Sequence, residues 1–95
     1  MAAPGSRERV KVPSQLPGDV WEWDEDAVKK FLMENKTEYR LKEEDIEIIR
    51  MNGIDGVLLF DVTAKELEGF GLNFASAKKI IQLFHFLKGP VEAGK

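Results

Sequence analysis

Few side chains in this sequence have the types and spacing that catalysis or metal binding requires. His85 is the only histidine and there is no cysteine, so the nitrogen and sulfur ligands of a zinc site are missing. Glu43, Glu44 and Asp45 are consecutive acids, and exposed carboxylates so close in sequence rarely gain the shifted pKa that acid–base catalysis needs. No nucleophile–base pattern or glycine-rich phosphate loop occurs. We therefore expect a domain without enzymatic activity, metal or cofactor.

The distribution of charge indicates a domain that works through its surface. Residues 24–68 carry 13 acidic and 7 basic side chains, whereas residues 69–95 carry four lysines and one glutamate. A nucleic-acid binder usually has a strong basic patch, and the net charge of −3 argues against one. A chain of 95 residues is one small domain with a thin core, which favours a binding surface over a deep cavity.

The elements that must position these charges have the sequence pattern of helices. Asp24 is a favourable N-cap, Thr63 and Glu66 have the spacing of a capping box, and Asn73 precedes the longest apolar stripe of the chain. Gly71 lies where a left-handed residue ends a helix. The pattern predicts an all-α, compact five-helix bundle with a long C-terminal helix, the helices covering about 25–35, 41–52, 57–60, 64–70 and 74–88.

The third of these helices rests on four consecutive apolar residues, Val57 to Phe60. A buried strand fits such a run, but no other segment reads as a strand with which it would pair. A short helix that is apolar nearly all round, and therefore buried nearly all round, is the more economical interpretation. We expect its two leucines to be core residues.

The two ends of the chain differ in composition from the middle. Residues 1–19 contain three prolines and two glycines among scattered charges, which predicts a flexible leader. The folded domain is expected over residues 20–89, followed by a disordered tail over 90–95. The absence of cysteine and of a signal peptide favours an intracellular protein, cytoplasmic or nuclear.

Several short motifs, in this order, resemble the sterile alpha motif (SAM) domain family. Trp23 is followed by Val28 and the pair Phe31-Leu32, then come Ile54-Asp55-Gly56 with Leu58-Leu59, the run "VTAKELEGFGL" at 62–72, and Lys79-Ile80 in the long helix. The resemblance covers about residues 21–88. The family often has glycine at the start of its fifth helix, where this chain has Ala75-Ser76-Ala77.

The resemblance implies a protein-interaction module that associates head to tail with itself or with another SAM domain. In the family an often acidic mid-loop surface meets an often basic end-helix surface, and such a contact need not close, so it can build open helical polymers. The mid-loop surface would comprise Asn52, Asp55, Asp61, Glu66 and Glu68. The end-helix surface would comprise Asn73, Phe74, Ser76, Lys78 and Lys79.

Each of these residues also has a simpler interpretation. The acids of the mid-loop surface fit helix capping or a turn, and the two lysines fit a solvated helix face. Phe74 fits a core or staple position, and Trp21 and Trp23 both fit packing roles. A few SAM domains bind an RNA hairpin through basic residues around helix 5, and this is the alternative function. A membrane-surface role has less support because the last helix lacks a basic polar face.

Overall fold

The computed structural model describes residues 10–88, and in this part of the chain all regular elements are helices. The predicted all-α bundle with a long C-terminal helix is confirmed. The α-helices are α1 (Glu25–Glu34), α2 (Lys36–Tyr39), α3 (Glu43–Met51), α4 (Ala64–Gly69) and α5 (Phe74–Lys88), and the 3-10 helices are η2 (Val20–Glu22) and η3 (Leu58–Phe60).

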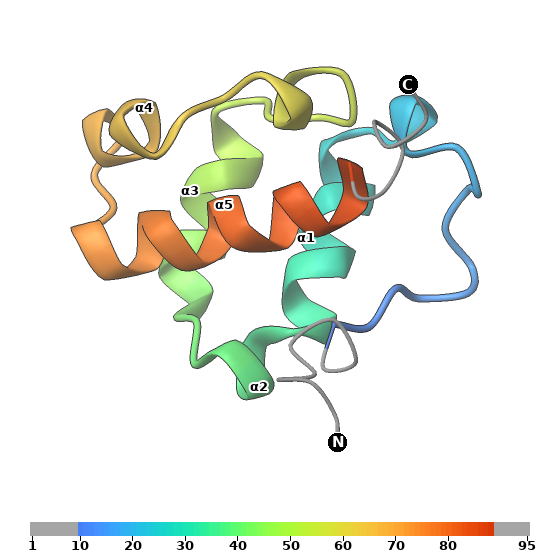
Figure 1. The fold of residues 1–95 in the computed structure, drawn as a ribbon, viewed down its shortest axis with the longest axis horizontal. Coiled ribbons are helices and arrows are strands. Elements are labelled where there is room, and N and C mark those ends of the chain that lie inside the picture. The colour runs from blue at the N-terminus through green and yellow to red at the C-terminus, as the bar shows by residue number, and fades with distance from the viewer. Residues whose placement is uncertain (1–9, 89–95) are drawn as a thin grey trace.

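The core lies where α5 crosses the pair formed by α1 and α3 (Figure 1). α1 packs against α3, and α5 contacts both α4 and η3. Phe31 of α1, Ile46 of α3 and Phe84 of α5 are fully buried in one apolar cluster. Trp23 closes this cluster from the N-terminal side, where its ring lies 5.5 Å from that of Phe31.

Local hydrogen bonds fix where the helices begin, as the sequence predicts. The carboxylate of Asp24 accepts from the backbone N–H of Ala27 at 2.8 Å. Thr63 and Glu66 form the reciprocal capping box, with distances of 3.1 and 3.0 Å. Asn73 accepts from the backbone of Ser76 at 2.8 Å and so caps α5. Each bond satisfies a backbone donor that the first turn of a helix leaves unpaired.

The helices α3 and α4 end in the same way. Gly53 (φ 75°) and Gly71 (φ 118°) follow the two C-caps in the left-handed region. The N–H of the next residue, Ile54 or Leu72, then bonds back five residues to a helix carbonyl. This is the Schellman pattern, and it turns the buried side chains of Ile54 and Leu72 into the core.

The prediction for residues 57–60 is confirmed for a short helix and for Leu59 in the core, and it is wrong for the burial of Val57 and Leu58. The segment forms a single 3-10 turn in which Leu59 is buried, whereas the side chains of Val57 and Leu58 are 41% and 44% exposed. The carboxylate of Asp55 accepts from the N–H groups of Val57 and Leu58 and so holds the turn. A 3-10 helix has three residues per turn. In this single turn, Leu58 to Phe60, only the side chain of Leu59 is buried.

The connection from α1 to α3 contains a helix that the sequence pattern did not indicate. Lys36–Tyr39 forms α2, and Arg40 ends it in the left-handed region at φ 57°. The described residues therefore contain five α-helices as predicted, but α2 takes the place that the sequence pattern gave to the run at 57–60.

Residues 10–19, part of the predicted leader, contact the folded domain. The buried side chain of Asn35 bonds to both backbone groups of Lys11, each at 2.8 Å, and the indole of Trp23 donates to the carbonyl of Pro17 at 2.8 Å. Val10 and Leu16 pack against the core. The leader and tail boundaries stay predictions, since residues 1–9 and 89–95 lie outside the described part.

Candidate functional site

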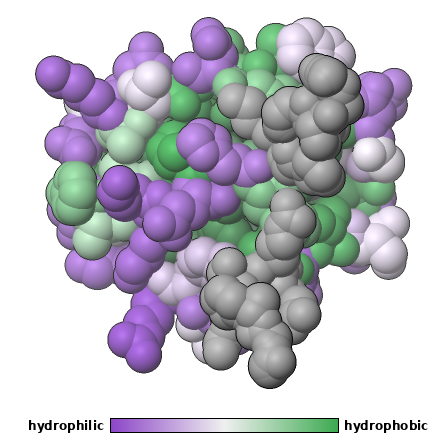
Figure 2. Space-filling view, viewed as in Figure 1, coloured by the Kyte–Doolittle hydropathy of each residue, from purple (hydrophilic) through white to green (hydrophobic). Residues whose placement is uncertain are grey.

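The start of α5 presents an aromatic side chain to solvent beside a lysine. Phe74, the first residue of α5, is 64% exposed. The ammonium of Lys78, one turn further along the helix, lies 5.9 Å from the centre of the Phe74 ring. This is a cation–π distance. Lys79 is partly exposed on the same turn. In Figure 2, apolar atoms stand out at the edge of the molecule where α5 begins.

Ser76, a predicted member of the end-helix surface, is buried instead. Its hydroxyl donates to a carboxylate oxygen of Asp45 at 2.7 Å, and both side chains are buried. The bond joins the first turn of α5 to the first turn of α3. Asp45 therefore places a carboxylate beside the positive end of the α5 dipole, where the sequence analysis expected an outside partner.

The acids of the predicted mid-loop surface belong to two separate elements. Asp61 directly follows the η3 turn and Asp55 lies three residues before it, whereas Glu66 and Glu68 lie on α4. Figure 1 shows η3 and α4 at different places along one edge of the fold, with α4 nearer the start of α5. The structure thus places two pairs of acids where the sequence analysis grouped them in one surface.

Several polar residues of the mid-loop surface already bond within the fold. Asp55 accepts from two backbone N–H groups of the η3 turn. Glu66 accepts from the Thr63 N–H in the capping box, and Asn52 donates to the carbonyl of Ile48 at 2.9 Å. Asp61 and Glu68 are exposed. The simpler interpretation, a cap or a turn, is therefore correct for Asp55 and Glu66, and it leaves their outer oxygens open to solvent contacts.

A stacked aromatic pair lies next to Asp61, with the Trp21 ring exposed and the Phe60 ring half-buried, and the sequence pattern did not indicate it. The rings of Trp21 in η2 and Phe60 in η3 stack with 6.1 Å between centroids and 18° between planes. Trp21 is 56% exposed, whereas Trp23, two residues later, is buried. Val57 is one 3-10 turn before Phe60 and so lies on the same side of η3. We call Trp21, Val57 and Phe60 the aromatic patch.

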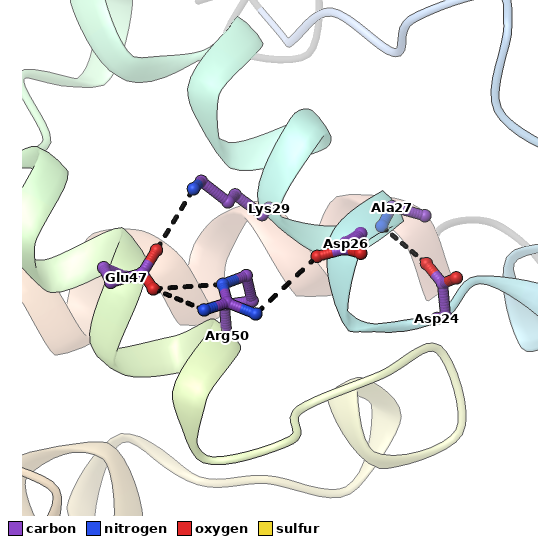
Figure 3. Close-up of polar contacts among 6 residues, drawn as sticks. All are labelled: Asp24, Asp26, Ala27, Lys29, Glu47 and Arg50. Carbon is purple, nitrogen blue, oxygen red and sulfur yellow. Dashed lines mark hydrogen bonds and ion pairs between the residues drawn. The ribbon is translucent and has the colours of Figure 1, made fainter.

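A cluster of ion pairs joins α1 to α3 away from these surfaces (Figure 3). Glu47 accepts from Arg50 at 2.6 Å and from Lys29 at 3.1 Å, and Arg50 also pairs with Asp26 at 3.8 Å. The hydrogen bonds from Arg50, and then from Lys29, lower the pKa of Glu47 to about 2. The bond to Glu47 raises the pKa of Arg50. The i, i+3 spacing of Glu47 and Arg50 indicates this pair in the sequence.

Within residues 10–88 we find no arrangement typical of a catalytic or metal centre. No group of three acidic, histidine or cysteine side chains in this range is placed to hold a metal ion. A groove of about 600 Å³ separates residues 13–15 from α1, and it is open and lined largely by charged side chains. None of the helices in this part of the chain is long and apolar enough to cross a membrane.

Comparison with known proteins identifies the family. The family described as the SAM-like domain matches residues 5–85, which is most of the chain. The protein therefore belongs to the SAM-like domain family. Domains of this family are generally non-catalytic protein-interaction modules. Searches of curated proteins and of solved structures gave no match.

Proposed function

We propose that this domain self-associates head to tail, with the start of α5 in one copy contacting the acids that flank η3 in the next. The observation that carries this proposal is Phe74, an aromatic ring that is 64% exposed at the first residue of the longest helix. A core or staple role does not account for this exposure. Aromatic residues, phenylalanine among them, are enriched at the centres of protein interfaces.

The charges around the two surfaces are complementary. Lys78 and Lys79 accompany Phe74, whereas Asp55 and Asp61 flank η3. Complementary charges select the partner and speed the encounter more than they add affinity. Exposed pairs are screened by salt, so association should weaken as ionic strength rises.

The positions of the two surfaces fit a contact that does not close on itself. Phe74 lies at the first turn of α5, which is about 22 Å long for 15 residues. η3 also contacts α5, and Figure 1 shows it farther from the start of α5 than α4 is. Two different patches meeting head to tail give a heterologous interface, which extends into chains unless the rotation between copies closes a ring.

Sedimentation velocity over a wide concentration range tests the proposal. Lys78→Glu/Lys79→Glu should weaken self-association about tenfold or more, because like charges then face each other across the contact. The matched control is Lys30→Glu/Lys42→Glu, which makes the same change of charge on α1 and before α3. A wild-type domain that stays monomeric at millimolar concentration would contradict self-association.

The RNA-hairpin alternative makes a different prediction. It requires several phosphate contacts, whose effect would be a steep loss of binding with added salt. The first turn of α5 lies against Asp45 in the acidic first turn of α3, which opposes an RNA backbone there. A gel shift with an RNA hairpin at low salt should therefore show no retarded band.

A further inference from the structure

We infer that the aromatic patch of Trp21, Val57 and Phe60 is the apolar centre of the acceptor surface and receives Phe74 of a second copy. This inference rests on the proposed function and names the site at which the second copy would bind. It adds η2, an N-terminal element, to an acceptor surface that the sequence analysis built from residues 52–68 alone.

The exposed ring of Trp21 is available to contact a partner. The ring is 56% exposed although Trp23, two residues later, already supplies the buried tryptophan of the core. Trp21 stacks on Phe60 at 6.1 Å, and Val57 is 41% exposed on the same side of η3. An aromatic pair of this kind offers a large apolar area at low cost in side-chain entropy.

The patch is built on a rigid junction between two segments distant in sequence. The N–H of Gly56 donates to the carbonyl of Trp23 at 2.8 Å. The backbones approach so closely that a Cβ on Gly56 would overlap the carbonyl oxygen of Val20. The carboxylate of Asp19 caps η2, and the carboxylate of Asp55 accepts from the N–H groups of Val57 and Leu58 where η3 begins. Because η2 and η3 are held together in this way, Trp21 and Phe60 are positioned before any partner arrives.

The patch and the start of α5 match in chemistry. The aromatic patch has carboxylates at its margin, with Asp61 next to Phe60 and Asp55 two residues before Val57. The start of α5 presents one aromatic ring with Lys78 beside it. A second copy thus presents groups complementary to the patch: the Phe74 ring for its apolar residues and the Lys78 ammonium for its carboxylates. Since each copy carries one patch and one Phe74, the contact repeats from copy to copy.

A mixing experiment tests the inference. Trp21→Ala should lower self-association at least about tenfold, and Phe74→Ala should do the same from the opposite surface. Each variant alone should sediment as a monomer at a concentration where wild type associates. An equimolar mixture should form a heterodimer and stop there, because Phe74→Ala keeps the acceptor and Trp21→Ala keeps Phe74.

Two further variants guard against effects on folding. Val57→Lys changes an exposed side chain and sets a cation against Lys78, so it should also abolish association. Val12→Lys is the matched control, because Val12 is 45% exposed beside Lys11, which bonds to Asn35 at the far end of α1. Circular dichroism melting should show that all four variants fold.

The outcomes separate this inference from the proposed function. If Phe74→Ala abolishes association while Trp21→Ala and Val57→Lys leave it unchanged, head-to-tail association stands and the aromatic patch is excluded as its acceptor. A mixture that fails to form heterodimers also overturns the inference. If neither Phe74→Ala nor Trp21→Ala changes the association of wild type, both proposals are overturned.

Discussion

The region around η3 and the start of α5 use their polar residues differently. Around η3, Asp55 holds the turn through two backbone bonds, and Gly56 permits the close approach of Trp23 and Val20. At the start of α5, the residues divide between two tasks. Asn73 and Ser76 bond inward, whereas Phe74 and Lys78 extend into solvent and contact each other.

This difference separates what holds the fold from what is available to a partner. Around η3 the carboxylate of Asp55 both holds the turn and is available to a partner, so a substitution of Asp55 changes stability and binding together. At the start of α5 the two tasks lie on neighbouring residues, so substitutions can separate them. Comparing the free energy of unfolding with the association constant, variant by variant, therefore tests the assignment of each surface.

The largest effect on folding is expected at the junction beneath η3. Gly56→Ala places a methyl group against the backbone of Val20 and Trp23, which cannot yield as a flexible side chain would. We expect the free energy of unfolding to fall by about 3 kcal/mol or more, measured by urea denaturation.

The matched control is Gly69→Ala at the end of α4, where an added Cβ meets no atom within 4 Å. Alanine favours helix over glycine, so this variant should be more stable by about 0.5 kcal/mol. Equal effects of the two substitutions would contradict the close approach at Gly56.

A smaller effect is expected inside the start of α5. Ser76→Ala removes the donor that Asp45 uses at 2.7 Å and leaves a buried carboxylate without that bond. The free energy of unfolding should fall by about 2 kcal/mol. Phe74→Ala, two residues away, should change it by less than about 0.5 kcal/mol because the ring is exposed. Urea denaturation of both variants measures this division, and a large loss for Phe74→Ala would show that the ring stabilises the fold.

Contacts between residues close in sequence could be predicted, whereas contacts between distant residues could not. The caps at Asp24, Thr63 and Asn73 were predictable because donor and acceptor are three residues apart. The bond between Asp45 and Ser76 joins residues 31 positions apart, and no spacing in the sequence reveals it.

The aromatic patch could not be predicted for a related reason. Trp21 and Phe60 are 39 positions apart and meet only once Gly56 joins the two segments. The four apolar residues at 57–60 look alike in sequence, and only the register of the 3-10 turn decides that Leu59 is buried while Val57 is exposed. The family resemblance gave the bundle correctly because that resemblance consists mostly of core and cap positions such as Trp23 and Leu67.

Two substitutions in the capping box of α4 separate the effect of the cap hydrogen bond from the effect of the Glu66 charge. Thr63→Ala removes the bond to the Glu66 N–H and should lower the free energy of unfolding by about 1 kcal/mol. Glu66→Gln keeps an oxygen for the Thr63 N–H and should change it by less than about 0.5 kcal/mol. Since Glu66 lies on α4 and not beside η3, we expect Glu66→Gln to associate as wild type does. Weaker association, measured by sedimentation, would extend the acceptor surface to α4.

The smallest effect is expected at the ion pairs between α1 and α3, which lie outside both surfaces. Glu47 has a pKa lowered from 4.5 to about 2, chiefly by its bond to Arg50. A lowered pKa in the folded state means a contribution to stability that is complete above about pH 4.5 and is lost as the pH falls toward 2. Glu47→Gln has no carboxylate to protonate there, so the melting temperatures of wild type and variant should converge as the pH is lowered through this range.

This substitution is also the charge control for the interaction surfaces. Glu47→Gln removes one negative charge, as Asp61→Asn does, but from the α1–α3 contact. At pH 7 it should leave self-association unchanged, whereas Asp61→Asn beside the aromatic patch should weaken it about two- to fivefold, as expected for a charge at the rim of an interface. Equal weakening by both would mean that net charge, and not the position of the acid beside η3, governs the contact.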